Sequence, residues 1–157
     1  MKVTLTINGE KIACEAPADE KLLDTLRRLG FTGAKKGCGE GTCGSCVVLI
    51  DGRPANSCLV FTASVEGRTV TTIEGLGDPA HPHPIEEEFV KAGAVQCGFC
   101  TPGMVLSAKA LLDVNPSPTE EQIKAALDGN LCRCTGYVKI IEAVRNAAVR
   151  AAAQPGK

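Results

Sequence analysis

Apolar and polar residues alternate at the start of the chain. Residues 3–7 (VTLTI) and 10–16 (EKIACEA) carry an apolar side chain at every second position, which predicts two half-buried strands. Asn8 and Gly9 between them are the dipeptide most typical of a two-residue hairpin turn. The register of that hairpin would give three pairs: Ile7 with Glu10, Leu5 with Ile12, and Val3 with Cys14. Cys14 would therefore face the core, where free cysteines are common, and a metal ligand is the alternative interpretation.

A pattern with helical spacing follows at residues 19–29, where leucines recur at Leu22, Leu26 and Leu29. Asp19 is a candidate N-cap for this helix, and Gly30 is a candidate stop. We therefore expect one amphipathic helix after the first hairpin.

A second hairpin is predicted around Asp51 and Gly52, which suit a type I′ turn between residues 47–50 (VVLI) and 53–57 (RPANS). Its register would pair Ile50 with Arg53, Val48 with Ala55, and Cys46 with Ser57. Residues 68–73 (RTVTTI) predict a further strand. Two hairpins, one helix and this strand together predict a mixed β-sheet crossed by a helix.

Glycine and proline dominate residues 74–84 (EGLGDPAHPHP), and the apolar period is helical after them. We therefore expect two domains, at residues 1–75 and 85–157, joined by a linker at residues 76–84. Four helices are expected in the second domain: residues 85–94, a helix with Thr101 as N-cap and Pro102 at N1, a helix opened by a capping box of Thr119 and Gln122, and a helix marked by Val138, Ile141, Val144 and Val149 that ends at Pro155–Gly156.

Composition and charge exclude several classes of function. The 157 residues are 44% hydrophobic and 22% charged with a net charge of −1, so nothing favours binding to nucleic acid or to an anionic membrane surface. No apolar run reaches transmembrane length, and no signal peptide precedes the first strand. Nine cysteines without a secretory signal indicate metal ligation in a reducing compartment, so we expect a cytoplasmic protein without membrane insertion.

The strongest chemical signal lies in residues 33–58, where the cysteines follow the spacing C-x4-C-x2-C with a distant fourth member: Cys38, Cys43, Cys46 and Cys58. This is the plant-type [2Fe-2S] spacing. Five glycines within the loop allow backbone N–H groups to approach an anionic cluster. The second hairpin would bring Cys58 close to Cys46. A zinc site and a disulfide pair are the alternatives, although structural zinc usually shows two short cysteine pairs.

The second half contains two more pairs, in the order C-x2-C and C-x-C: Cys97, Cys100, Cys132 and Cys134. The sequences CGFCTPG and CRCTGY resemble each other, because each continues from Cys-Thr through a glycine into a helix. We interpret them as two helix–loop–helix units that meet face to face, with helix N-termini near the thiols. A four-cysteine zinc site remains open for this motif by spacing alone. His81 and His83 could also be ligands, but no cysteine is near them in sequence, and we interpret them as linker residues.

The motifs GCGEGTCGSC, QCGFCTPG and CRCTGY, in this order, closely resemble the small two-cluster iron–sulfur subunits of the molybdenum hydroxylases. That family includes relatives of xanthine dehydrogenase, aldehyde oxidoreductase and aerobic carbon monoxide dehydrogenase. The resemblance extends from the first hairpin to about Val149. It implies an α+β protein in which a β-grasp, plant-type ferredoxin-like [2Fe-2S] domain precedes an all-α four-helix domain. The second domain would have a pseudo-two-fold duplication and a second [2Fe-2S] cluster.

The resemblance also implies partners and an order of cofactors. A large subunit would hold molybdenum on a molybdopterin, a medium subunit would hold FAD, and the whole would be a hetero-oligomer such as a dimer of heterotrimers. The cluster of the helical domain would lie near the pterin, which Gln96 and Cys134 would contact; for Gln96 a polar loop residue is the alternative. Electrons would pass from the molybdopterin centre through both clusters to FAD or another acceptor. The chain itself would carry no substrate chemistry, since no catalytic constellation is visible in it.

Two other functions are open at this stage: a structural zinc protein without redox function, and a free-standing two-cluster ferredoxin that diffuses between partners. Such a carrier would be expected to show a pronounced charged patch for steering. The balanced charge of the chain argues against it.

Overall fold

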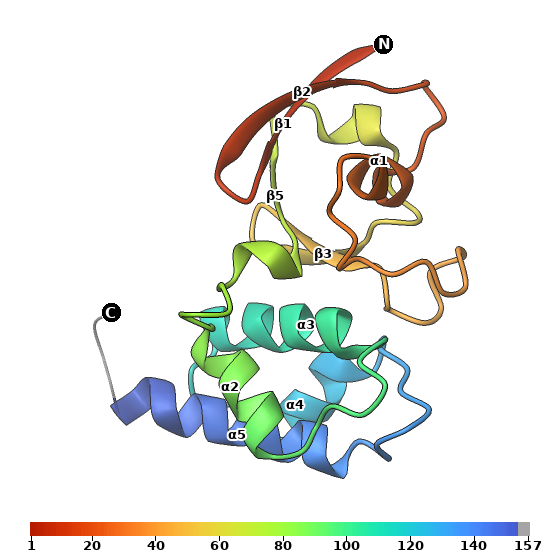
Figure 1. Cartoon of the computed structure of the whole chain (residues 1–157). Coiled ribbons are helices and arrows are strands. Elements are labelled where there is room, and N and C mark those ends of the chain that lie inside the picture. Colours follow the sequence, from red (N-terminus) through yellow and green to blue (C-terminus); the bar gives the residue numbers. More distant parts are fainter. Residues whose placement is uncertain (154–157) are drawn as a thin grey trace.

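A computed structural model of the chain describes residues 1–153. A five-stranded sheet crossed by a short helix forms one part of the molecule, and a group of four helices forms the other (Figure 1). The α+β class predicted from the sequence is confirmed at this level, with a mixed sheet and five α-helices in the described part of the chain.

The sheet has the strand order β2-β1-β5-β3-β4. Its strands are β1 (Lys2–Ile7), β2 (Glu10–Glu15), β3 (Val47–Ile50), β4 (Arg53–Asn56) and β5 (Thr69–Thr71). Only β1 and β5 pair in parallel, and the other three pairings are antiparallel. Both predicted hairpin registers are confirmed, with Val3 opposite Cys14 in the first and Val48 opposite Ala55 in the second. Asn8 and Asp51 adopt positive φ angles of 51° and 49°, as type I′ turns require.

Helix α1 (Leu22–Arg28) lies over the sheet, and its start differs from the prediction. Lys21, not Asp19, occupies the N-cap position, and no side chain caps the helix. The cause is a tertiary contact, because Lys21 forms an isolated antiparallel bridge with Phe61 and is held in extended backbone. Gly30 adopts a φ of +96° directly after the helix, which agrees with its predicted role as the stop.

The remaining helices are α2 (Pro84–Lys91), α3 (Thr101–Val114), α4 (Glu120–Leu127) and α5 (Val138–Ala153), with 3-10 turns η1 (Thr62–Val65) and η2 (Ile73–Gly75) before them. The capping box of Thr119 and Gln122 is confirmed at α4. Thr101 is the first residue of α3 and Cys100 holds the N-cap position, so the prediction of Thr101 as N-cap was wrong by one residue. The predicted stop at Pro155–Gly156 lies outside the described residues.

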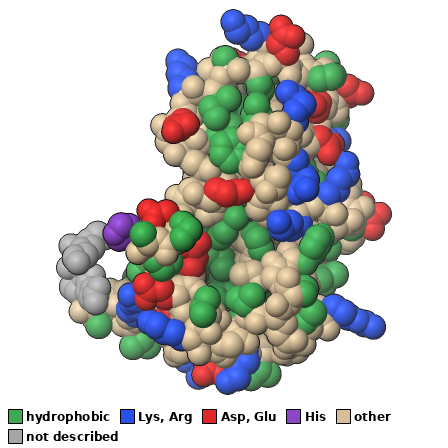
Figure 2. All heavy atoms as spheres, in the orientation of Figure 1, with side chains coloured by type: hydrophobic (Ala, Val, Ile, Leu, Met, Phe, Trp, Pro, Cys, Tyr) green, Lys and Arg blue, Asp and Glu red, His purple; other side chains and the backbone are tan. Residues whose placement is uncertain are grey.

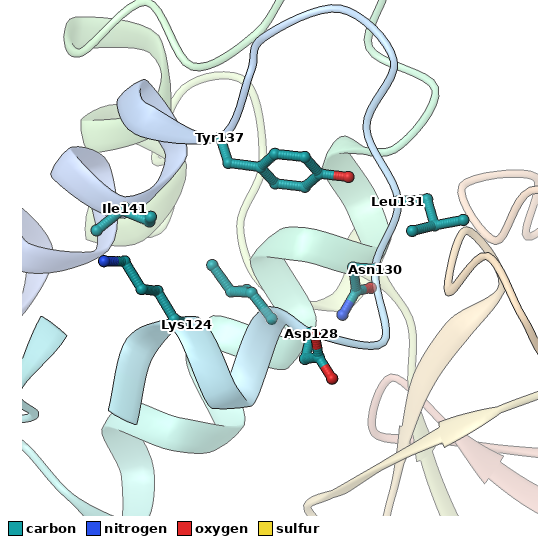
Figure 3. A pocket seen from close by; sticks show the side chains of 7 residues that line it. Lys124, Asp128, Asn130, Leu131, Tyr137 and Ile141 are labelled. Carbon is teal, nitrogen blue, oxygen red and sulfur yellow. The ribbon is translucent and has the colours of Figure 1, made fainter. Parts of the chain in front are cut away.

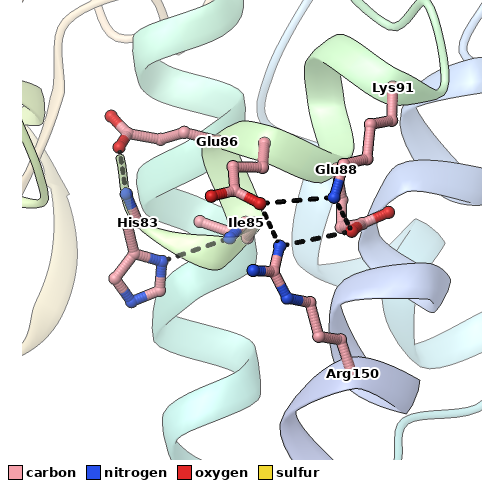
Figure 4. A network of polar contacts seen from close by, with 7 residues as sticks. His83, Ile85, Glu86, Glu88, Lys91 and Arg150 are labelled. Atoms are coloured by element: carbon pink, nitrogen blue, oxygen red, sulfur yellow. Dashed lines mark hydrogen bonds and ion pairs between the residues drawn. The ribbon is translucent and has the colours of Figure 1, made fainter. Parts of the chain in front are cut away.

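His83, expected to be a linker residue, has a structural role. Its Nδ1 accepts the backbone N–H of Ile85 at 3.2 Å, and the Glu86 carboxylate accepts the His83 N–H at 2.7 Å, which completes a capping box at α2 (Figure 4). In the same region Arg150 of α5 forms ion pairs with Glu87 and Glu88 of α2. The ion pairs of Arg150 hold α2 against α5.

Three groups of buried side chains stabilise the molecule. One lies between the sheet and α1 and includes Cys14, which is 9% exposed. A second fills the space among α2, α3, α4 and α5. The third joins the two parts, because Val47 and Leu49 of β3 pack against Leu106 and Ala110 of α3. Figure 1 shows α3 directly beneath β3.

Charged side chains of both signs lie on the surface of the molecule. Acidic and basic side chains are interspersed on the face seen in Figure 2. Within residues 1–153, no helix combines the length and the apolar character that crossing a membrane would need.

Candidate metal centres

The first group of thiols lies in the loop between α1 and β3 and in the segment after β4. Gly39, Gly41 and Gly44 all have positive φ angles, so the loop turns sharply around its cysteines. The second hairpin acts as predicted, because the Ser57 N–H and hydroxyl both donate to the carbonyl oxygen of Cys46, at 3.4 and 2.7 Å. Cys58, the next residue, is thereby brought beside Cys46, and both are buried.

Backbone and hydroxyl groups surround these sulfur atoms with hydrogen-bond donors. The N–H of Cys38 donates to the Cys43 Sγ, and the N–H of Glu40 donates to the Cys38 Sγ, both at 3.4 Å. A hydrogen bond from the Thr42 side chain, with help from the Glu40 N–H, lowers the pKa of Cys38 to about 6. Burial, and then the neighbouring Cys46, raises the pKa of Cys58 to about 11. Bound metal would favour the thiolate at Cys58, since a coordinating thiol is deprotonated outright.

The second group of thiols lies in two loops, one between α2 and α3 and the other between α4 and α5. Their sulfurs meet in two pairs, with Cys97 and Cys134 3.6 Å apart and Cys100 beside Cys132. Burial, and then Cys132, raises the pKa of Cys100 to about 12. Burial also acts to raise the pKa of Cys132, but the hydroxyl and N–H of Thr135 outweigh it and the pKa falls to about 7. The pKa of Cys134 is raised by its hydrogen bond with Cys97.

The donor set fits a [2Fe-2S] cluster at each place. All nine cysteines are free, so no disulfide uses the thiols. Each iron of such a cluster takes two thiolates and two inorganic sulfides. The thiols stand in pairs: Cys38 with Cys43, Cys46 with Cys58, Cys97 with Cys134, and Cys100 with Cys132. A structural zinc ion needs four protein ligands around one point. Across residues 1–153, no three His, Cys, Asp or Glu side chains are placed to share one ion.

The two groups of thiols are in contact through their loops. The backbone N–H of Leu131, next to Cys132, donates to the carbonyl oxygen of Cys43 at 2.9 Å. Asn130 is buried beside this bond, and its Nδ2 donates to the Ser107 hydroxyl of α3 at 2.9 Å. The first cysteine loop therefore rests on the second through backbone and buried polar contacts.

The two residues expected at the pterin lie at the surface. Gln96 directly precedes Cys97 in the loop after α2, and both Gln96 and Cys134 are exposed. They belong to two different loops that meet, because the sulfurs of Cys97, the neighbour of Gln96, and Cys134 are 3.6 Å apart. The two histidines that were interpreted as linker residues lie at the start of α2 (His83) and near Asp78 (His81).

Besides Thr42 at Cys38, three more polar residues at the thiols were not predicted. The hydroxyl of Ser45 lies 3.1 Å from the Cys43 Sγ, and that of Thr135 lies 3.1 Å from the Cys132 Sγ. The Tyr137 hydroxyl accepts the N–H of Cys132 at 2.9 Å. Tyr137 lines a cavity of about 340 Å³. In Figure 3 its ring points from the start of α5 toward the loop at Leu131. The repeated Cys-Thr in the two loops was the available signal, but spacing does not reveal which hydroxyl reaches a sulfur.

Comparisons with known proteins agree with this geometry. The family model described as a 2Fe-2S iron-sulfur cluster binding domain matches residues 5–70, and that of a [2Fe-2S] binding domain matches residues 72–145. The chain is 48% identical over 151 residues to the nicotinate dehydrogenase small FeS subunit of Eubacterium barkeri, covering 96% of each chain. It is 43% identical to the aldehyde oxidoreductase of Megalodesulfovibrio gigas, covering 92% of this chain but 16% of that one.

Among solved structures, quinoline 2-oxidoreductase from Pseudomonas putida 86 matches with a TM-score of 0.94 and 41% identity. The match covers 99% of this chain and 97% of that one. The similarity therefore extends over the whole fold. The chain belongs to the family of small iron–sulfur subunits of the molybdenum hydroxylases.

Proposed function

We propose that this chain carries electrons between a molybdenum centre and a further acceptor, with its two [2Fe-2S] clusters held by eight assigned cysteines. Cys38, Cys43, Cys46 and Cys58 would hold the first cluster, in a β-grasp domain at residues 1–75. Cys97, Cys100, Cys132 and Cys134 would hold the second, in a four-helix domain at residues 85–157 with an internal duplication. Residues 76–84 would join the domains. The pairwise approach of the thiols supports both ligand sets.

The observation that carries this proposal is the hydrogen bond from the Leu131 N–H to the Cys43 carbonyl oxygen, 2.9 Å long. Leu131 is bonded to one proposed ligand, Cys132, and Cys43 is itself a proposed ligand of the other cluster. A continuous path of covalent bonds and one hydrogen bond therefore runs between the two ligand sets. When bound, the clusters supply one-electron redox chemistry, since each accepts and releases single electrons.

The residues of this chain would hold and surround the clusters. Cys46 and Cys58 are buried at 2% and 5% exposure, so protein and not water surrounds half of the first ligand set. Glycines at positive φ bring N–H groups toward sulfur without a side chain between them. Because Cys38 is exposed while Cys46 is buried, the first site has an open side and a closed side.

We place the second ligand set next to the molybdopterin. Gln96 and Cys134 are both exposed and lie in two loops that meet at the sulfurs of Cys97 and Cys134, so a partner can reach them. The Gln96 side chain offers an amide donor and an amide acceptor, which suit the polar edge of a heterocycle. The first ligand set would then lie on the exit side, toward FAD or another acceptor.

The partners follow from this placement. A large molybdopterin subunit would cover the region of Gln96 and Cys134, and a medium FAD subunit would lie near Cys38. We propose a hetero-oligomer such as a dimer of heterotrimers, in the cytoplasm, where a reducing environment keeps thiols available as ligands. Substrate chemistry would belong to the molybdenum subunit alone.

Purification of the native complex tests the proposal. The complex should contain a molybdenum subunit, and this chain should carry four iron and four sulfide ions with two distinct [2Fe-2S] EPR signals. Replacing Cys43 by Ser should alter one signal, and replacing Cys132 by Ser should alter the other. Two irons per chain, zinc in place of iron, or a fully loaded chain that migrates alone on size-exclusion chromatography would contradict it.

A further inference from the structure

Thr135 makes two contacts with the sulfur of Cys132. Its hydroxyl lies 3.1 Å from the Cys132 Sγ, and its backbone N–H donates to the same atom at 3.5 Å. Thr135 itself is half-buried. The sulfur therefore faces two donors from one residue.

Tyr137 determines which partner donates in the hydrogen bond between the Thr135 hydroxyl and the Cys132 sulfur. The backbone N–H of Tyr137 donates to the Thr135 Oγ1 at 3.2 Å, which uses the oxygen as an acceptor. The single hydroxyl proton of Thr135 is then free to point at Cys132. Tyr137 adopts a φ of +70° and also accepts the Cys132 N–H at its own hydroxyl, 2.9 Å away. Three residues of one loop thus form a closed set of hydrogen bonds around the sulfur.

The other group of thiols has two hydroxyls beside it, that of Thr42 at Cys38 and that of Ser45, and both have divided contacts. The Ser45 Oγ lies 3.1 Å from the Cys43 Sγ and 3.3 Å from the carbonyl oxygen of Lys35. A serine hydroxyl has one proton, and here two acceptors compete for it. Ser45 therefore offers its sulfur a shared donor, whereas Thr135 offers a dedicated one.

We propose that the hydroxyl of Thr135 raises the reduction potential of the second cluster by donating a hydrogen bond to its ligand Cys132. The inference rests on the ligand sets proposed above. Reduction adds negative charge to a cluster and its sulfur ligands, and a donor fixed on a ligand sulfur stabilises the more negative state more strongly. Thr135 is a positioning residue in this role, since it acts through Cys132. Its effect would set the driving force for transfer between the two clusters.

The test is a redox titration of the holoenzyme, followed by EPR, with Thr135→Val and Thr135→Ser variants. Valine has the shape of threonine without the hydroxyl, and serine keeps the hydroxyl without the methyl group. Thr135→Val should shift the equilibrium for reduction of one cluster about tenfold toward the oxidised form, which is about 59 mV for a one-electron couple. Thr135→Ser should retain most of the wild-type potential. The other cluster should be unchanged in both variants, and Ser45→Ala should shift that other cluster by less.

Several outcomes would overturn the inference. An unchanged potential in Thr135→Val, or an equal fall in Thr135→Val and Thr135→Ser, would show that the hydroxyl does not tune the cluster. Where Thr135→Val contains less iron, Thr135→Ala takes its place, and loss of iron in both would assign the hydroxyl to holding the cluster instead. The Cys132→Ser variant distinguishes a wrong role for Thr135 from a wrong assignment of the ligands. If it alters neither EPR signal, the ligand assignment is wrong, and if it alters one while Thr135→Val shifts nothing, only the role of Thr135 is wrong.

Discussion

Gly103 of α3 and Gly44 of the first cysteine loop are pressed together so closely that a Cβ added to Gly103 would lie 2.2 Å from the Gly44 carbonyl oxygen. A Cβ added to Gly44 would in turn lie 2.3 Å from the carbonyl oxygen of Gly129. Backbone therefore meets backbone where the two parts of the molecule join. The Leu131–Cys43 hydrogen bond lies in the same region and depends on this close approach.

Replacing Gly103 by Ala should separate the two cysteine loops. No flexible side chain can yield to the new methyl group, so the backbone must shift, and we expect a loss of about 1–3 kcal/mol in the free energy of unfolding. Denaturant unfolding measures this loss, and the magnetic coupling between the two reduced clusters in EPR should weaken. Gly129→Ala is a matched control, because a Cβ there would meet nothing within 4 Å. Equal effects of the two substitutions would contradict the prediction.

The elements that the sequence predicted best are those with local causes. The Asn8–Gly9 turn sets the first hairpin, and all three predicted pairs occur in it. The capping box of Thr119 and Gln122 is equally local, because both partners lie within one helical turn.

The features that were missed depend on contacts between distant segments. The bridge between Lys21 and Phe61 delays the start of α1, and nothing near Asp19 in sequence indicates it. Likewise, Leu131 and Cys43 are 88 positions apart, so their hydrogen bond could not be derived from spacing. At the candidate sites, cysteine spacing was enough to propose the ligand residues, but the hydroxyl donors could be found only in the folded loops.

Cys14 should be dispensable for both clusters. It is 9% exposed in the core beneath the sheet and lies opposite Val3 on β1. Cys14→Ser places a hydroxyl in an apolar site, which should lower the free energy of unfolding by about 1–3 kcal/mol. Iron content and both EPR signals should stay at the wild-type level. The exposed neighbour Ala13 provides a control, since Ala13→Ser should change stability little; loss of iron in Cys14→Ser alone would make Cys14 a ligand.

The cap of α2 should make stability depend on pH. Burial first, and then the positive charge of Lys109, lowers the pKa of His83 below its ordinary value of 6.5. A neutral Nδ1 accepts the Ile85 N–H, and protonation removes that acceptor. The unfolded chain therefore binds the proton more readily. The contribution of His83 is complete above pH 6.5 and is lost as pH falls through the lower folded pKa.

Asparagine provides the control at this position. His83→Asn keeps a good N-cap but does not titrate, so its stability should fall less than that of the wild-type protein between pH 7.5 and pH 5.5. The difference between the two should be no more than about 2 kcal/mol, the upper value for a lost cap. Urea unfolding at the two pH values measures it. Identical pH profiles would show that His83 stays neutral in both states or caps nothing.

Variants that interrupt electron transfer at different points can determine the order of the two clusters in the electron path. If the second ligand set faces the molybdopterin, Cys134→Ser disturbs both a ligand and the pterin contact. Electrons should then leave reduced molybdenum slowly, and rapid-freeze EPR after mixing with substrate should show a persistent molybdenum(V) signal. Cys43→Ser should instead leave the first transfer fast and block the next one, so that a reduced second cluster accumulates.

The opposite pattern has an equally definite meaning. Persistent molybdenum(V) in Cys43→Ser, with fast loss of that signal in Cys134→Ser, would place the ferredoxin-like domain beside the molybdenum. The exposure of Gln96 and Cys134 argues against that arrangement, because a partner can reach both where their two loops meet. Gln96→Ala adds an independent check, since Gln96 is not a thiol ligand. It should slow the first transfer while both clusters keep their iron, and a normal rate would remove the pterin contact from the proposal.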